Sequence, residues 1–142
     1  MKAFLMGFLA LLATAGHAAD DQRQLAPMPP AADASLRAEM RANLLALNEI
    51  LGLVASGKYR EAGQIAEDEL GVSAMGKHRN LPFDARPGPH MPPAMHSAGV
   101  DGHQAASEFA RIAASGDREK TIAALPLLTS GCVACHYAYR IR

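Results

Sequence analysis

The chain has 142 residues, and its 14 Lys and Arg balance its 14 Asp and Glu, so the formal net charge is zero. This length supports one domain with one core. The missing positive charge argues against a nucleic-acid-binding protein, which needs a basic surface. Only 5% of the residues are aromatic and none is Trp. A composition rich in Ala and Leu, without the β-branched and aromatic enrichment of strands, predicts an all-helical fold.

Residues 1–18 have the features of a secretory signal peptide. Lys2 supplies the positive charge, residues 4–15 the apolar run, and residues 16–18 a cleavage site of the small-x-small type. The apolar run is too short to span a bilayer, and no later segment was expected to be long and apolar enough. We therefore expect export to the periplasm without stable membrane insertion; an uncleaved anchor is the alternative.

Residues 19–32 contain three prolines and predict a flexible lead-in to a helical domain over residues 33–142. Asp33 or Ser35 is expected to cap the first helix, which ends at Ser56-Gly57. Apolar residues recur along it every three or four positions, which predicts one buried stripe: Leu36, Met40, Leu44, Leu47, Leu51 and Val54.

A second helix is expected from Lys58 to about Leu70, and the very short connection makes it an antiparallel neighbour of the first. Residues 71–93 are rich in proline and predict a long loop, since proline interrupts helices and loops of this length are often functional.

The third helix is expected over about residues 94–114, with a stripe of small side chains that lets a backbone or a flat ring come close. The fourth follows a cap at Asp117. Pro126 should bend this helix or mark its true start. Two helical hairpins joined by a long loop predict an all-α, antiparallel four-helix bundle.

The C-terminal run Cys132-Val133-Ala134-Cys135-His136 is the Cys-x-x-Cys-His attachment sequence of haem c. The two cysteines would form thioethers to one covalent haem, and His136 would be the proximal iron ligand. Residues three and four apart share a helical face, so one face can hold both the ring and the iron.

Other uses of this cysteine pair fit less well. A redox pair belongs at a helix N-terminus in a βαβ unit, whereas this pair comes late in a helical pattern. A zinc site needs four ligands, and the chain has only two cysteines. Thioether attachment of haem takes place outside the cytoplasm, which agrees with the signal peptide.

With Tyr139 and Arg140, the run reads Cys-x-x-Cys-His-x-x-Tyr-Arg near the C-terminus, which resembles the class II c-type cytochromes, the cytochrome c′ group. The resemblance implies a four-helix bundle that holds haem between its helices. In one kind of member a methionine of the first helix is the sixth iron ligand, and the protein carries electrons. In the other an apolar residue covers a five-coordinate iron that binds small gases.

Met40 lies on the first-helix stripe where the family's distal residue is found, and its thioether would raise the haem potential. The alternative is core filling, with Leu36 and Leu44 forming an apolar wall over the iron. Tyr139 and Arg140 follow His136 by three and four residues and are expected on its helical face. Tyr139 would pack on the ring. Arg140 would pair with a propionate or lie near the imidazole, or favour the helix dipole.

The loop and third helix also hold a group of Met and His residues that could bind copper(I) or another soft metal, although solvated side chains are the default: Met75, His78, His90, Met91, Met95, His96 and His103. His96 or His103 is a further alternative for the axial position.

These features predict a periplasmic c-type cytochrome that acts as a one-electron carrier; the alternative is a five-coordinate cytochrome c′ that binds NO or CO. No polar cluster beyond the haem site is apparent that would hold a substrate, so we expect no enzyme beyond incidental peroxidase activity. The partner would be another redox protein, which the sequence does not name. Members of the family often pair through their first two helices, so the resemblance also implies a homodimer.

Overall fold

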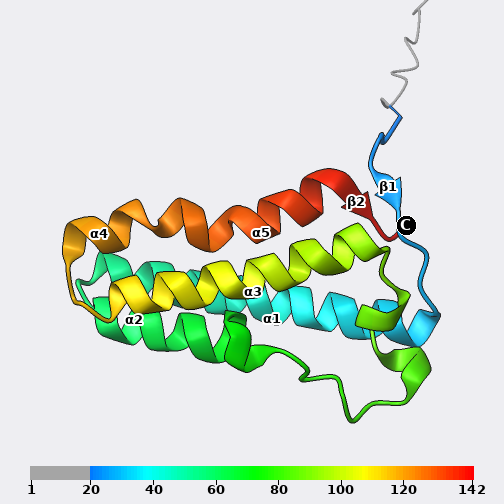
Figure 1. Ribbon diagram of the computed structural model, residues 1–142, viewed down its shortest axis with the longest axis horizontal. Helices are drawn as coiled ribbons and strands as arrows, with labels where there is room; N and C mark the ends of the chain where they lie inside the picture. The colour runs from blue at the N-terminus through cyan, green and yellow to red at the C-terminus, as the bar shows by residue number, and fades with distance from the viewer. Residues whose placement is uncertain (1–19) are drawn as a thin grey trace, which may run out of the picture.

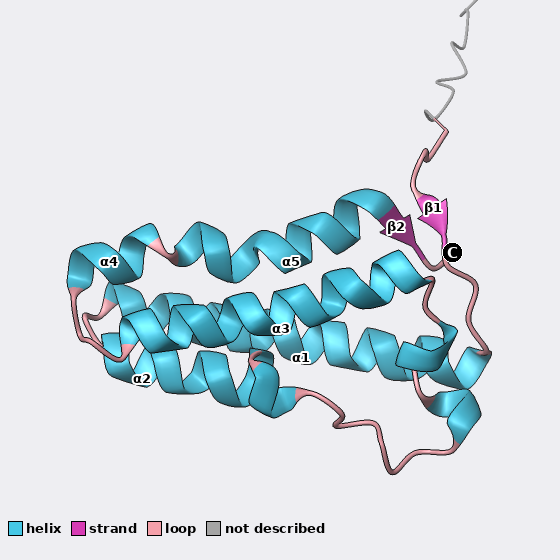
Figure 2. Cartoon of the chain, in the orientation of Figure 1, coloured by secondary structure: helices cyan, strands magenta, loops and turns pink. Residues whose placement is uncertain are grey.

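The computed structural model describes residues 20–142, so the expected signal peptide lies outside the described part. The described chain is an antiparallel four-helix bundle with a long loop between its second and third helices, as predicted (Figures 1 and 2). The helices are α1 (Pro30–Ala55), α2 (Tyr59–Ile65) continued by the π-helical η1 (Ala66–Leu70), α3 (Pro93–Ala113), and α4 (Arg118–Ala123) followed by α5 (Leu125–Ala138). The loop holds three short 3-10 turns, η2 (Val72–Ala74), η3 (Phe83–Ala85) and η4 (Gly88–His90).

The first helix begins earlier than predicted. Pro30 opens α1, at a position where the missing N–H of proline costs no hydrogen bond. Neither Asp33 nor Ser35 acts as the cap, because both lie within the helix; the Asp33 carboxylate instead accepts a hydrogen bond from Arg37 Nε at 2.8 Å.

The buried face of α1 is only partly the predicted one. Leu36 and Val54 are buried as expected, but Leu44 and Leu51 are 68% and 45% exposed. Leu44 follows Leu36 by eight residues, which turns it about 80° around the helix axis at 3.6 residues per turn. Ile50 occupies the inward position in the later turns and is fully buried.

The segment before α1 pairs with the C-terminal end of the chain. Gln24–Leu25 forms strand β1, which pairs in parallel with β2 (Tyr139–Arg140). The Ala26 amide donates to the carbonyl of Arg140 at 2.8 Å, and the Ala26 side chain is fully buried. The two ends of the described chain therefore meet at one end of the bundle (Figure 1).

The fourth helical segment is divided at Ala124. Pro126 stands in the first turn of α5, where no helical hydrogen bond is lost, so it marks a true helix start. Asp117 caps α4 as predicted, since its Oδ1 accepts from the Lys120 amide at 3.0 Å.

Taken together, residues 118–138 are long enough to cross a membrane and contain an 18-residue window that is apolar enough, with a mean hydropathy of 1.3. The prediction that no such segment follows residue 18 was therefore wrong. Core helices of soluble proteins meet the same criterion but are mostly buried, whereas only 17% of this window is buried, although α5 packs along α3.

Helices α3 and α5 approach each other closely at two glycines. A Cβ placed on Gly131 would lie 3.2 Å from the Gly102 nitrogen and closer still to the Gly102 Cα. The expectation that small residues of the third helix admit a neighbouring backbone is confirmed at Gly102. Gly99, one turn earlier, has nothing within 4 Å of its added Cβ.

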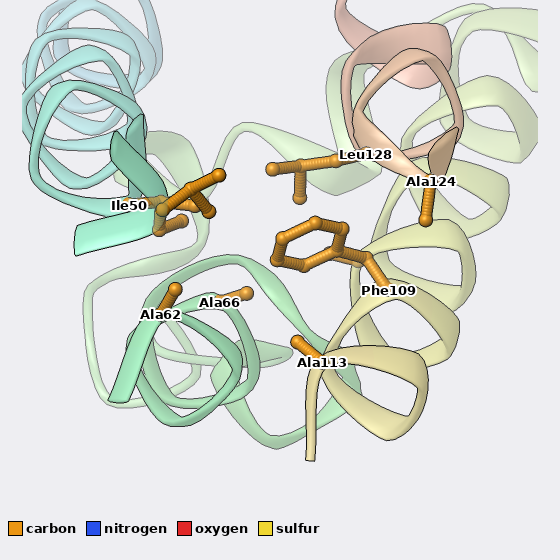
Figure 3. Close-up of a cluster of buried hydrophobic side chains, with 9 residues drawn as sticks. Ile50, Ala62, Ala66, Phe109, Ala113, Ala124 and Leu128 are labelled. Carbon is orange, nitrogen blue, oxygen red and sulfur yellow. The ribbon is translucent and has the colours of Figure 1, made fainter. Parts of the chain in front are cut away.

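The bundle has two hydrophobic clusters. The larger one is built around Phe109, with Leu128 of α5 and Ile50 of α1 beside it (Figure 3). The smaller one lies at the end where the termini meet, and we call it the sulfur-rich cluster. It consists of buried Ala26, Leu36 and Met95 with partly buried Met28, Met40, Met91, Cys135, Tyr139 and Ile141.

Candidate functional site

The Cys-x-x-Cys-His run occupies the last two turns of α5. Helix α5 forms because residues 127–138 carry no proline and the early Pro126 is tolerated in the first turn. The helical spacing places Cys132, Cys135 and His136 within about 100° of one another around the axis. Both thiols are free of disulfides.

The three side chains differ in their surroundings. Cys135 is half-buried against the sulfur-rich cluster, with its Sγ 3.9 Å from the carbonyl oxygen of Met95. Burial, with a smaller contribution from nearby Cys132, raises the pKa of the Cys135 thiol. Cys132 and His136 are exposed. One thiol therefore faces the protein interior, while the other thiol and the imidazole remain accessible to a group that approaches from outside.

Met40 is partly buried and packs against the same cluster as Cys135. The structure thus brings together two predicted site residues that are far apart in sequence, one from α1 and one from α5. Leu36 lies in this cluster too, but Leu44 points to solvent. Of the predicted apolar wall, only Leu36 lies in the cluster, and the prediction for Leu44 is wrong.

Tyr139 and Arg140 do not continue the helix, which corrects the prediction that they share its face with His136. The backbone of Tyr139 is extended, with φ −126° and ψ 150°, and both residues belong to β2. Tyr139 nonetheless packs on the sulfur-rich cluster. Arg140 lies near Asp21, with its Nε 3.9 Å from the carboxylate.

Sequence reasoning missed the N-terminal segment as a neighbour of His136. Arg23 Nη1 lies 3.5 Å from the carbonyl oxygen of His136, and its guanidinium also pairs with Asp21 at 2.7 Å. Hydrogen bonds from Arg23 lower the pKa of Asp21 to about 2. Gln22 and Arg23 line an open depression of about 610 Å³ together with His136 and its two following residues. No local pattern signals this contact, because it depends on strand pairing between the two ends.

Two histidines of the predicted Met and His group have other partners. His78 Nε2 is 3.0 Å from Glu39 Oε2, while Lys77 pairs with Glu39 Oε1. His103 Nδ1 is 2.8 Å from the Leu70 carbonyl oxygen. Across residues 20–142, no three His, Cys, Asp or Glu side chains come together to hold a metal ion.

The methionines are distributed differently from the histidines. Met91 and Met95, both in the predicted Met and His group, pack in the sulfur-rich cluster, whereas Met75 is exposed outside it. Met28, which the sequence did not single out, joins them. Met28 lies between Pro27 and Pro29, outside any helical repeat, so the spacing of apolar residues did not predict that it would be partly buried.

Comparisons with protein-family models, with curated proteins and with solved structures found no match to this chain. The described residues belong to a small, all-helical, four-helix protein, and the resemblance to class II c-type cytochromes depends on the C-terminal motif and this architecture.

Proposed function

We propose that this chain is an exported c-type cytochrome that carries one electron on a single haem attached to Cys132 and Cys135. The observation that carries the proposal is the Cys-x-x-Cys-His run on α5, with Met40 of α1 packed against the same cluster as Cys135. His136 would be the proximal ligand. The haem supplies reversible one-electron chemistry; the chain supplies its attachment, orientation and electrostatic surroundings.

The exposed apolar surface of α5 supports the proposal of a bound haem. Helix α5 packs on α3, and α1 packs on α2, but α1 and α5 have few contacts with each other. Only 17% of the apolar window in residues 118–138 is buried. Such a face would be costly to leave in water, and a porphyrin inserted beside it would cover part of it. The free thiols and exposed imidazole on this helix fit attachment there.

The surrounding residues have roles in this proposal. Met40 would offer its thioether as the sixth ligand, since soft sulfur donors suit haem iron and raise its potential. Tyr139 would pack on the ring edge near Cys135, with which it shares a cluster. Arg140 would act on a propionate or on the proximal imidazole; Asp21 lies only 3.9 Å from its Nε and would moderate its charge.

A five-coordinate haem that binds NO or CO is the second candidate. Leu36 favours it, because this side chain is almost fully buried in the same cluster, one turn before Met40. If Met40 turned away from the iron, Leu36 would leave an apolar distal side open to a small gas. Incidental peroxidase activity belongs to this candidate rather than to the electron carrier.

The spin state of the purified, haem-loaded protein separates the two candidates. A six-coordinate iron with methionine should be low-spin, and Met40→Leu should convert it to high-spin iron that binds CO. Met75→Leu is the matched control, since Met75 is exposed outside the sulfur-rich cluster and should leave the spectrum unchanged. A wild-type protein that is already high-spin and binds CO readily would favour the gas-binding candidate instead.

Exposed leucines of α1 offer a surface for the homodimer that the resemblance implies. The α1 side chains that were expected inside, Leu44 and Leu51, are exposed together with Leu45. Pairing through α1 would bury this apolar surface. Replacing Leu44 and Leu45 with Gln should then convert a dimer to a monomer in analytical ultracentrifugation, without changing the helical circular dichroism.

A further inference from the structure

Sulfur is unevenly divided between the two hydrophobic clusters. Residues 20–142 contain five methionines and two cysteines. Four of the methionines and one cysteine pack in the sulfur-rich cluster. The larger cluster, built from aliphatic side chains and two aromatic residues, contains no sulfur atom at all. Methionine is a good filler of irregular cores, but a general need for filling would apply to both clusters.

The sulfur atoms come from separate segments of the chain. Met28 precedes α1, Met40 belongs to α1, Met91 ends the long loop, Met95 lies in the first turns of α3, and Cys135 is on α5. The β1–β2 pairing and the close α3–α5 crossing draw these segments to one end of the bundle. The convergence is therefore tertiary and does not follow from a methionine-rich stretch of sequence.

We propose that the sulfur-rich cluster is a binding site for a soft monovalent cation, copper(I), with the thioethers of Met28, Met91 and Met95 as its ligands. Thioethers are soft, uncharged donors, and such donors select copper(I) over harder cations. Thioethers also need no deprotonation before they bind a cation. Met40 and Cys135 are left to the haem of the proposed function, and the copper site does not require that function to hold.

Partial exposure makes a cationic complex tolerable at this place. Met28 and Met91 are only partly buried, so a bound ion would remain near the surface and keep part of its hydration. The nearby cationic side chains have acidic neighbours: Arg37 pairs with Asp33 at 2.8 Å, and Arg140 lies 3.9 Å from Asp21. Pairing reduces the repulsion of a positive ion by Arg37, whereas the repulsion by Arg140 is only partly offset, because Asp21 also pairs with Arg23 at 2.7 Å.

The test is a competition titration of the mature, purified protein with copper(I) held by a chromophoric chelator, and with silver(I) as a redox-inert probe. Free thiols are first blocked with iodoacetamide, so that they cannot bind copper(I) in a protein that lacks haem. In a protein that carries haem, both cysteines are already thioethers and are not alkylated. The copper titration therefore gives a result whether or not the haem is attached. We expect one equivalent to bind. The triple variant Met28→Leu, Met91→Leu and Met95→Leu should weaken binding by at least about tenfold.

Two controls complete the test. Leucine has nearly the volume of methionine, so the variants should keep their helical circular dichroism; if the triple variant fails to fold, Met28→Leu and Met91→Leu are measured singly. Met75→Leu should bind copper(I) as the wild type does. Absence of stoichiometric binding by the wild type, or equal affinity in the wild type and the cluster variants, would overturn the proposal.

Discussion

The crossing of α3 and α5 at Gly102 and Gly131 gives the sharpest prediction about this fold. Gly131→Ala adds one methyl group, which would meet the backbone of Gly102 and lie 3.7 Å from the carbonyl oxygen of Ala98. A backbone neighbour cannot rotate away, so the two helices must separate. Because Gly131 directly precedes Cys132, the separation would also displace the Cys-x-x-Cys-His run.

The magnitude follows from two opposing contributions. Alanine is favoured over glycine inside a helix by about 1 kcal/mol, whereas overpacking a close contact costs about 1–3 kcal/mol. Gly99→Ala is the matched control, since it lies on α3 and its added Cβ meets nothing within 4 Å. Helix propensity is common to both variants, so their difference in unfolding free energy is the overpacking cost of about 1–3 kcal/mol.

Urea denaturation followed by circular dichroism measures this difference in unfolding free energy, and thermal denaturation gives the corresponding Tm values. Gly99→Ala should be as stable as the wild type or more stable, and Gly131→Ala should be the less stable of the pair, with a Tm lower by at least about 4 °C. A Gly131→Ala protein as stable as Gly99→Ala would show that α3 and α5 do not cross at these glycines, and the placement of the site on α5 would have to be revised.

Three further predictions concern other elements. Hydrogen bonds, chiefly from Ser107, lower the pKa of Glu67 below its ordinary 4.5. The stability that ionised Glu67 contributes is therefore present above pH 4.5 and is lost as the pH falls through the lowered pKa. The difference in urea midpoint between the wild type and Glu67→Gln should shrink over that range, and a difference that stays constant with pH would contradict this. Asp117→Ala should lower the Tm through loss of the α4 cap, whereas Asp117→Asn, an equally good cap, should not. Replacing both Cys132 and Cys135 with Ala should give a haem-free chain of lower thermal stability, and unchanged haem content would exclude thioether attachment.

The helices were predictable because their signals are local. Gly57 and Gly116 adopt φ values of 75° and 74°, which glycine reaches without strain, and both end a helix at the expected turn. The loop was predictable from its prolines. The helix start at Pro126 was predictable because proline has no N–H to donate to a helical hydrogen bond. Each of these features acts within a few residues of its position.

The features that the sequence did not reveal are all non-local. The β1–β2 pair has two residues on each side, too short for a periodic signal, and joins segments more than a hundred residues apart. The rotation of Leu44 to the surface follows from accumulated helix phase, which a list of apolar steps of three and four does not track. The gathering of Met28 with Met91 and Met95 depends on how the segments meet, which no single segment encodes.

The central claim is a haem held covalently by Cys132 and Cys135, and the most direct measurement is the intact mass of the mature protein together with its visible spectrum. The protein is produced by export in a host that attaches haem c. The account predicts a red protein whose mass exceeds that of the processed chain by one haem, and which loses this haem when both cysteines are replaced. A colourless protein with the mass of the polypeptide alone would contradict it.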